Sequence, residues 1–100
     1  MKRLVQDLLA DAVTRAWPDI DTADAPHVER TRDAAHGDFA SNIAMTLTKT
    51  LRRNPREIAQ TIIDTLTEDE RIDRVEIAGP GFINFFLAPA AFRAAIDDVL

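Results

Sequence analysis

The chain of 100 residues contains no cysteine and no tyrosine, a single tryptophan and only three glycines. Without cysteine, disulfide bonds, thiolate nucleophiles and cysteine metal ligands are all excluded. No apolar run approaches the roughly 20 residues that a membrane-spanning helix needs, so we expect no membrane segment. Asp7 and Asp11 follow soon after the first residues, which argues against a secretory signal and makes the cytoplasm the default location.

Positive charge is also in short supply, because 12 Lys and Arg face 17 Asp and Glu, for a net charge of -5. A general nucleic-acid binder should instead be basic. The one basic cluster comprises Lys49, Arg52, Arg53 and Arg56, with no acid before Glu57. Such a cluster can contact a phosphate backbone, but it is equally typical of a solvated helix end, where cations are favoured. Both interpretations stay open.

The usual catalytic devices are missing as well. His27 and His36 are the only histidines, and no recognised metal-ligand spacing surrounds them. The Gly-Pro-Gly sequence at 79–81 has neither the spacing nor the lysine of a phosphate-binding loop. The acidic run at 68–70 is typical of a solvated connection. We therefore expect no catalytic residue and no metal site in this chain.

Apolar residues at the helical period predict three helices within a single domain. The first covers residues 2–17 and ends at Pro18, since the residue before a proline avoids helical geometry. The second begins with Asp38 as its N-cap, and its apolar stripe consists of Phe39, Ala40, Ile43, Ala44, Leu47 and Leu51. The third begins with Asn54 as N-cap and Pro55 as its first residue, and extends to residue 66.

A last helix is expected from Pro89 onward. Asp97 and Asp98 would lie in its final turn, where negative charge opposes the helix dipole. A helix that continues into a longer protein would explain this ending, and so would a frayed tail.

Strands are predicted at 27–32, with Val28 inward, and as a hairpin of residues 72–78 and 82–87 around the Gly-Pro-Gly turn. Alternation along the second hairpin strand places Phe82, Asn84 and Phe86 on one face, while its other face is apolar. A side-chain amide between aromatic rings is suited to reading an unstacked nucleobase. The alternative is a sheet covered on both faces, with Asn84 hydrogen-bonded inside it.

Two segments together resemble the N-terminal additional domain of arginyl-tRNA synthetases. They are His36-Gly37-Asp38-Phe39-Ala40-Ser41-Asn42 and Val75-Glu76-Ile77-Ala78-Gly79-Pro80-Gly81-Phe82-Ile83-Asn84-Phe85-Phe86-Leu87. The likeness extends from about residue 28 to residue 95, and the helix at 55–66 lies between the two segments.

The resemblance implies an α+β fold of two layers, with helices packed on one face of a small antiparallel sheet, over residues 1–100. It also implies recognition of a D-loop base at the elbow of the tRNA for arginine, with Phe82 and Asn84 as the reading residues. Phe86 and the basic cluster are further candidates. Asp38, Phe39 and Asn42 are interpreted as cap, core and helix-packing residues without a binding role.

The same resemblance implies that ATP and the transfer of arginine belong to a catalytic domain of the same polypeptide, because this chain lacks the family's ATP-binding signatures. The alternative is a protein-interaction or regulatory module of the same fold that does not bind RNA, and the acidic balance favours it. A small standalone enzyme is disfavoured for want of a site.

Overall fold

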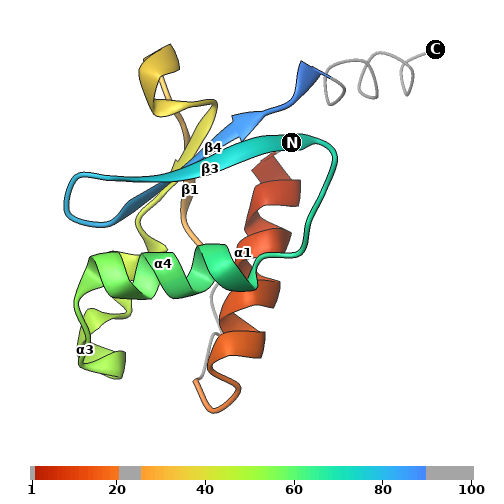
Figure 1. The fold of residues 1–100 in the computed structure, drawn as a ribbon. Helices are drawn as coiled ribbons and strands as arrows, with labels where there is room; N and C mark the ends of the chain where they lie inside the picture. The colour runs from red at the N-terminus through yellow and green to blue at the C-terminus, as the bar shows by residue number, and fades with distance from the viewer. Residues whose placement is uncertain (1, 21–25, 90–100) are drawn as a thin grey trace.

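The computed structural model describes residues 2–20 and 26–89, which form two layers (Figure 1). The helical elements are α1 (Lys2–Ala16), the 3₁₀ turn η1 (Ala34–His36), α2 (Ile43–Thr46), α3 (Thr48–Leu51) and α4 (Pro55–Thr65). The strands are β1 (Val28–Arg30), β2 (Phe39–Ser41), β3 (Ile72–Ala78) and β4 (Phe82–Leu87), paired antiparallel in the order β1-β2-β4-β3. The predicted two-layer α+β fold is confirmed.

The core lies between the sheet and the two long helices, α1 and α4 (Figure 1). Each helix buries one apolar stripe, because residues three and four apart share a helix face. The sheet contributes the inward side chains of β4, Ile83 and Phe85, which are both 0% exposed. The fully buried residues of α1 and α4 are Val5, Leu9, Ala12, Val13, Ile58, Ala59 and Ile62. One face of the sheet is therefore covered.

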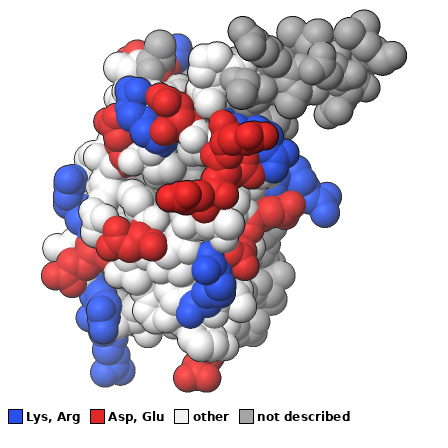
Figure 2. Space-filling model, turned by 45° about the vertical axis from the view of Figure 1, so that its right-hand side comes forward, with Lys and Arg blue, Asp and Glu red and all other residues white. Residues whose placement is uncertain are grey.

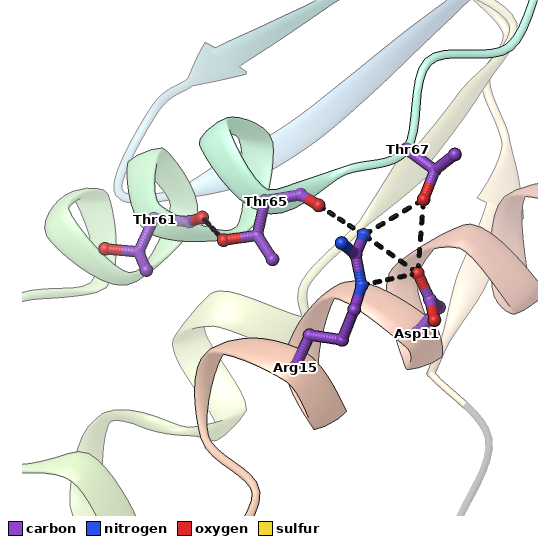
Figure 3. A network of polar contacts seen from close by, with 5 residues as sticks. All are labelled: Asp11, Arg15, Thr61, Thr65 and Thr67. Atoms are coloured by element: carbon purple, nitrogen blue, oxygen red, sulfur yellow. Dashed lines mark hydrogen bonds and ion pairs between the residues drawn. The ribbon is translucent and has the colours of Figure 1, made fainter.

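A polar network fastens the ends of α1 and α4 to each other (Figure 3). The guanidinium of Arg15 donates to the Thr65 carbonyl at 2.5 Å, to the Thr67 hydroxyl at 3.0 Å, and to a carboxylate oxygen of Asp11 at 2.9 Å. Carbonyls in the last turn of a helix have no partner within that helix. Arg15 supplies one for α4 and so links the C-terminal ends of the two helices.

The predicted start of the second helix is wrong. Phe39–Ser41 is the strand β2, and the helix begins only at Ile43. Asp38 caps no helix, since its carboxylate accepts the backbone N–H of Leu87 at 2.8 Å. The hydroxyl of Ser41 accepts from the backbone N–H of Ile43 at 3.2 Å instead. The physical reason is that β1 and β4 both offer unpaired backbone groups beside this segment, and pairing with two strands outweighs one turn of local helix.

The second helix, predicted as one segment, is divided into α2 and α3, and η1 was not predicted. Other described elements agree with expectation. The helix at 2–17 and both hairpin strands lie where they were predicted, and Val28 of β1 is 1% exposed. The Asn54 side chain accepts the backbone N–H of Arg56 at 2.8 Å, as an N-cap should. The predicted last helix, with Asp97 and Asp98, lies outside the described residues. Within 2–20 and 26–89, none of the helices combines the length and apolar character needed to cross a membrane.

Candidate functional site

The sheet face opposite the helices carries the alternate residues of each strand. Here Ala40 of β2 and Glu76 of β3 pair with Asn84 on either side, and Ala78 pairs with Phe82. Two of these neighbours are alanines, and their small side chains leave space on the sheet surface beside Asn84 and Phe82. A pocket of about 640 Å³ opens at this place.

The walls of the pocket come from two separate connections. The turn at Ala78, Gly79 and Pro80 forms one wall, while β1 and the loop that follows it form the other. The second wall carries both signs of charge and consists of Glu29, Arg30, Thr31, Arg32, Asp33 and His36. Phe82, Asn84 and Ala40 lie between the two walls. The pocket thus combines an aromatic ring, a side-chain amide and nearby charged groups.

Asn84 is one of the two buried polar residues among those that the structure describes. It is only 4% exposed, yet its side-chain amide makes no hydrogen bond with any other residue that the structure describes. An amide offers one acceptor and two donors. The amide atoms of Asn84 are not among the fully buried polar atoms without a partner, so they keep a narrow opening to solvent. Phe82 lies two residues earlier on the same face and is 40% exposed. Among the residues that the structure describes, it is the one large apolar residue that is exposed. Together they offer a stacking surface beside unused hydrogen-bonding groups.

Phe86 shares this sheet face but not the pocket lining. The guanidinium of Arg74 lies over its ring, 3.9 Å from the centroid. Arg74 also donates from Nε to Glu76 at 2.5 Å, and that hydrogen bond raises the pKa of Arg74 above its usual value. One face of the Phe86 ring is therefore occupied by a cation. The structure brings Phe82 and Asn84 together and sets Phe86 apart from them.

The basic cluster lies at the corner where α3 turns into α4. Arg52 ends α3 in a left-handed conformation with φ of 54°. Lys49, Arg52 and Arg53 are exposed, and their side chains form no hydrogen bond or ion pair with another residue in the described ranges. Arg56 differs, because its Nη1 donates to the carbonyl of Gly79 at 2.5 Å. The face shown in Figure 2 mixes acidic and basic side chains without a continuous basic area.

Sequence reasoning missed the second pocket wall, whose charged residues are Glu29, Arg30, Arg32 and Asp33 and which also contains His36. Because β2 was predicted as helix, the antiparallel pairing of β1 with β2 was not expected, and neither was the loop that joins these strands. The only local signal was the alternation of inward Phe39 and Ser41, which are 7% and 1% exposed. Three residues are too few for alternation to outweigh a helical period.

Comparisons with known proteins give a consistent result. A family model described as the arginyl-tRNA synthetase N-terminal domain matches residues 2–87. An arginine–tRNA ligase of Shewanella piezotolerans is 47% identical over 104 residues, covering 100% of this chain and 18% of the ligase. One from Pseudomonas savastanoi pv. phaseolicola is 45% identical over 100 residues, covering 100% of this chain and 17% of the ligase. The chain therefore spans less than a fifth of these relatives.

Solved structures show the same fold. An arginyl-tRNA synthetase of Thermus thermophilus superposes with a TM-score of 0.77 and 26% identity, covering 96% of this chain and 16% of that one. The arginyl-tRNA synthetase of Plasmodium falciparum has a TM-score of 0.82 at 16% identity, covering 95% of this chain and 17% of that one.

Proposed function

Because this chain belongs to the family of arginyl-tRNA synthetase N-terminal domains, we propose that it is the tRNA-binding part of an arginine–tRNA ligase. In this proposal the ligase attaches arginine to its tRNA with ATP, and both the ATP site and the chemistry belong to a catalytic domain of the same polypeptide. The role of this chain is to hold the tRNA elbow.

The pocket on the open sheet face receives one base of the D-loop. The base stacks on the exposed ring of Phe82, and the Asn84 amide hydrogen-bonds its edge. The observation that supports this is the amide of Asn84, which is 4% exposed and has no partner among the described residues. The edge of a base presents donors and acceptors side by side and satisfies such an amide, whereas an apolar protein side chain does not. Stacking on an aromatic ring is worth about 1–3 kcal/mol per base.

Phosphate contacts are assigned to the corner between α3 and α4, which Arg56 joins to Gly79 of the pocket wall. The exposed cations Lys49, Arg52 and Arg53 meet the backbone that flanks the bound base. Contacts of this kind position the RNA without selecting its sequence. Selection is then left to Phe82 and Asn84.

The test uses the ligase that carries this chain, with aminoacylation of the tRNA for arginine as the readout. Phe82→Leu keeps an apolar side chain but removes the stacking ring, and Asn84→Ala removes the amide. We expect each to lower kcat/KM for tRNA about tenfold, the equivalent of roughly 1.4 kcal/mol. The matched control is Phe86→Leu, the same change on the same strand face, where Arg74 already covers the ring. It should change kcat/KM less than twofold.

A tRNA with a substituted D-loop base gives the complementary measurement. The parent ligase should discriminate against it, and the Phe82→Leu ligase should no longer do so. Equal kcat/KM for the parent and both pocket variants, with folding intact, would contradict base reading. That result would favour the alternative, a protein-interaction or regulatory module that does not bind RNA. The net charge of -5 also favours this alternative.

A further inference from the structure

The turn that carries Phe82 has one hydrogen bond of its own, from the Gly81 N–H to the Ala78 carbonyl at 3.2 Å. Residues Gly79, Pro80 and Gly81 join β3 to β4, and both glycines have positive φ, 56° and 142°. Glycine has more backbone freedom than any other residue, so contacts from outside a turn with two glycines restrict it further. Phe82 follows directly and would share any movement of the turn. What holds the turn therefore also sets the position of the Phe82 ring.

The start of α4 provides the first of these contacts. Gly81 is buried against Pro55, since a Cβ placed on Gly81 would lie 2.9 Å from the Cβ of Pro55 and 3.2 Å from its carbonyl oxygen. The backbone of the turn thus packs directly on the first residue of the helix. Pro55 has a fixed φ and is a stiff support.

Arg56 provides the second contact. Its Nη1 donates to the Gly79 carbonyl at 2.5 Å, across 23 positions of sequence. The backbone N–H of Arg56 is in turn held by the Asn54 cap at 2.8 Å. Gly79 lines the pocket, whereas Arg56 does not. The guanidinium therefore acts on the wall of the pocket from outside it.

We propose that Arg56 is a positioning residue for base reading. With Pro55 it clamps the Gly79–Gly81 turn, so that the Phe82 ring is already in its stacking position before the tRNA arrives. This assigns Arg56 a different role from Lys49, Arg52 and Arg53, with which it was grouped as a candidate phosphate contact. The proposal rests on the function proposed above, because it acts through Phe82.

The two roles predict different salt dependence. A cation that contacts phosphate releases counterions, so removing it lowers the slope of log K against log salt by about 0.7 to 0.9 per contact. A positioning residue changes affinity without changing the slope. The experiment measures tRNA binding to the ligase at several salt concentrations for Arg56→Ala and for Arg53→Ala. The second variant removes an equal charge from the same corner without touching Gly79.

We expect Arg56→Ala to weaken tRNA binding about fivefold with an unchanged salt slope. This loss should be smaller than that of Phe82→Leu, because the stacking ring is still present but is less well positioned. The double variant Arg56→Ala/Phe82→Leu should bind as the single Phe82→Leu variant does, because residues that act as one unit are not additive. Because Arg56 is exposed, the thermal unfolding midpoint of the Arg56→Ala variant should stay close to that of the parent.

Three outcomes overturn the inference. Arg56→Ala binding as the parent does, while Phe82→Leu is impaired, would remove the positioning role and leave base reading intact. A lowered salt slope, together with full additivity with Phe82→Leu, would make Arg56 a phosphate contact. If Phe82→Leu itself has no effect on binding or aminoacylation, base reading fails, and the positioning role fails with it.

Discussion

Asp38 shows how much one side chain depends on its distant neighbours. Its carboxylate accepts the Leu87 N–H at 2.8 Å, and its backbone N–H donates to the Phe85 carbonyl at 2.8 Å. Gly37 makes this approach feasible, since a Cβ there would lie 2.5 Å from the Phe85 carbonyl oxygen and its φ is 79°. The pair Gly37-Asp38 therefore fastens the second pocket wall to β4, the strand that carries Phe82 and Asn84.

Asp38→Ala should lower the free energy of unfolding by about 1–3 kcal/mol, because it leaves the Leu87 N–H without its acceptor. Asp38→Asn keeps an acceptor oxygen and should cost less. Urea unfolding followed by circular dichroism measures both. Asp33→Ala is the control from the same loop, where the carboxylate accepts the Ala35 N–H at an exposed position. Equal losses for Asp38→Ala and Asp33→Ala would contradict the assigned role.

At the scale of elements, the connection from α4 to β3 is more ordered than its composition suggests. The Asp69 carboxylate accepts from the Arg71 guanidinium at 2.9 and 2.7 Å and from the Arg71 backbone N–H at 2.9 Å. Hydrogen bonds from the Arg71 side chain, and then from its backbone, lower the pKa of Asp69 from 3.8 to about 2. The acidic run expected to be a solvated loop thus contains one carboxylate that shapes the entry into β3.

This shift makes stability depend on pH in a defined window. Because the pKa of Asp69 is lower in the folded protein, the ionised carboxylate favours folding above pH 4, and this contribution is lost as the pH falls toward 2. Asp69→Asn should cost about 1 kcal/mol at pH 7, a value reduced by the exposure of the Arg71 side chain, and almost nothing at pH 2. Chemical unfolding at both pH values measures it.

The control for this pH dependence is Asp73→Asn, whose ion pair with Arg74 is about half exposed on both sides. It should change stability by less than about 0.5 kcal/mol at either pH. A cost of Asp69→Asn that stays constant from pH 7 to pH 2 would show that the ion pair is not its source.

For the whole molecule, the charge balance is acidic although a basic cluster lies at one corner. The net charge is -5, and the face in Figure 2 has no continuous basic area. An acidic domain gains little from long-range attraction to RNA. In the proposed function, binding then depends on a few local contacts, which are those of the base pocket and of the basic corner at Lys49, Arg52 and Arg53.

The triple variant Lys49→Ala/Arg52→Ala/Arg53→Ala separates these contributions. We expect it to weaken binding of the parent tRNA and of a tRNA with a substituted D-loop base by the same factor, and to lower the salt slope by about 2 to 3. Phe82→Leu should have the opposite pattern, with lost discrimination and an unchanged slope. Measuring tRNA binding between about 50 and 200 mM salt distinguishes the triple variant from Phe82→Leu. Loss of discrimination in the triple variant would contradict the division.

The elements predictable from sequence are those whose signal is local. The helical period of α1 and α4, the Asn54-Pro55 start of α4 and the alternation of β4 each depend on residues a few positions apart. The same alternation placed Phe82 and Asn84 on one face. These features follow from side-chain geometry along one segment, whatever the rest of the chain does.

The tertiary structure decided whatever required a partner from far along the chain. Residues 39–41 became a strand because β1 and β4 supplied backbone partners on both sides, and Asp38 found its partner 49 positions away. Arg74 covered Phe86, and Arg56 reached Gly79. Each of these outcomes satisfies a hydrogen-bonding group or a ring face that local sequence leaves open, and only the packed chain determines which group comes near enough to satisfy it.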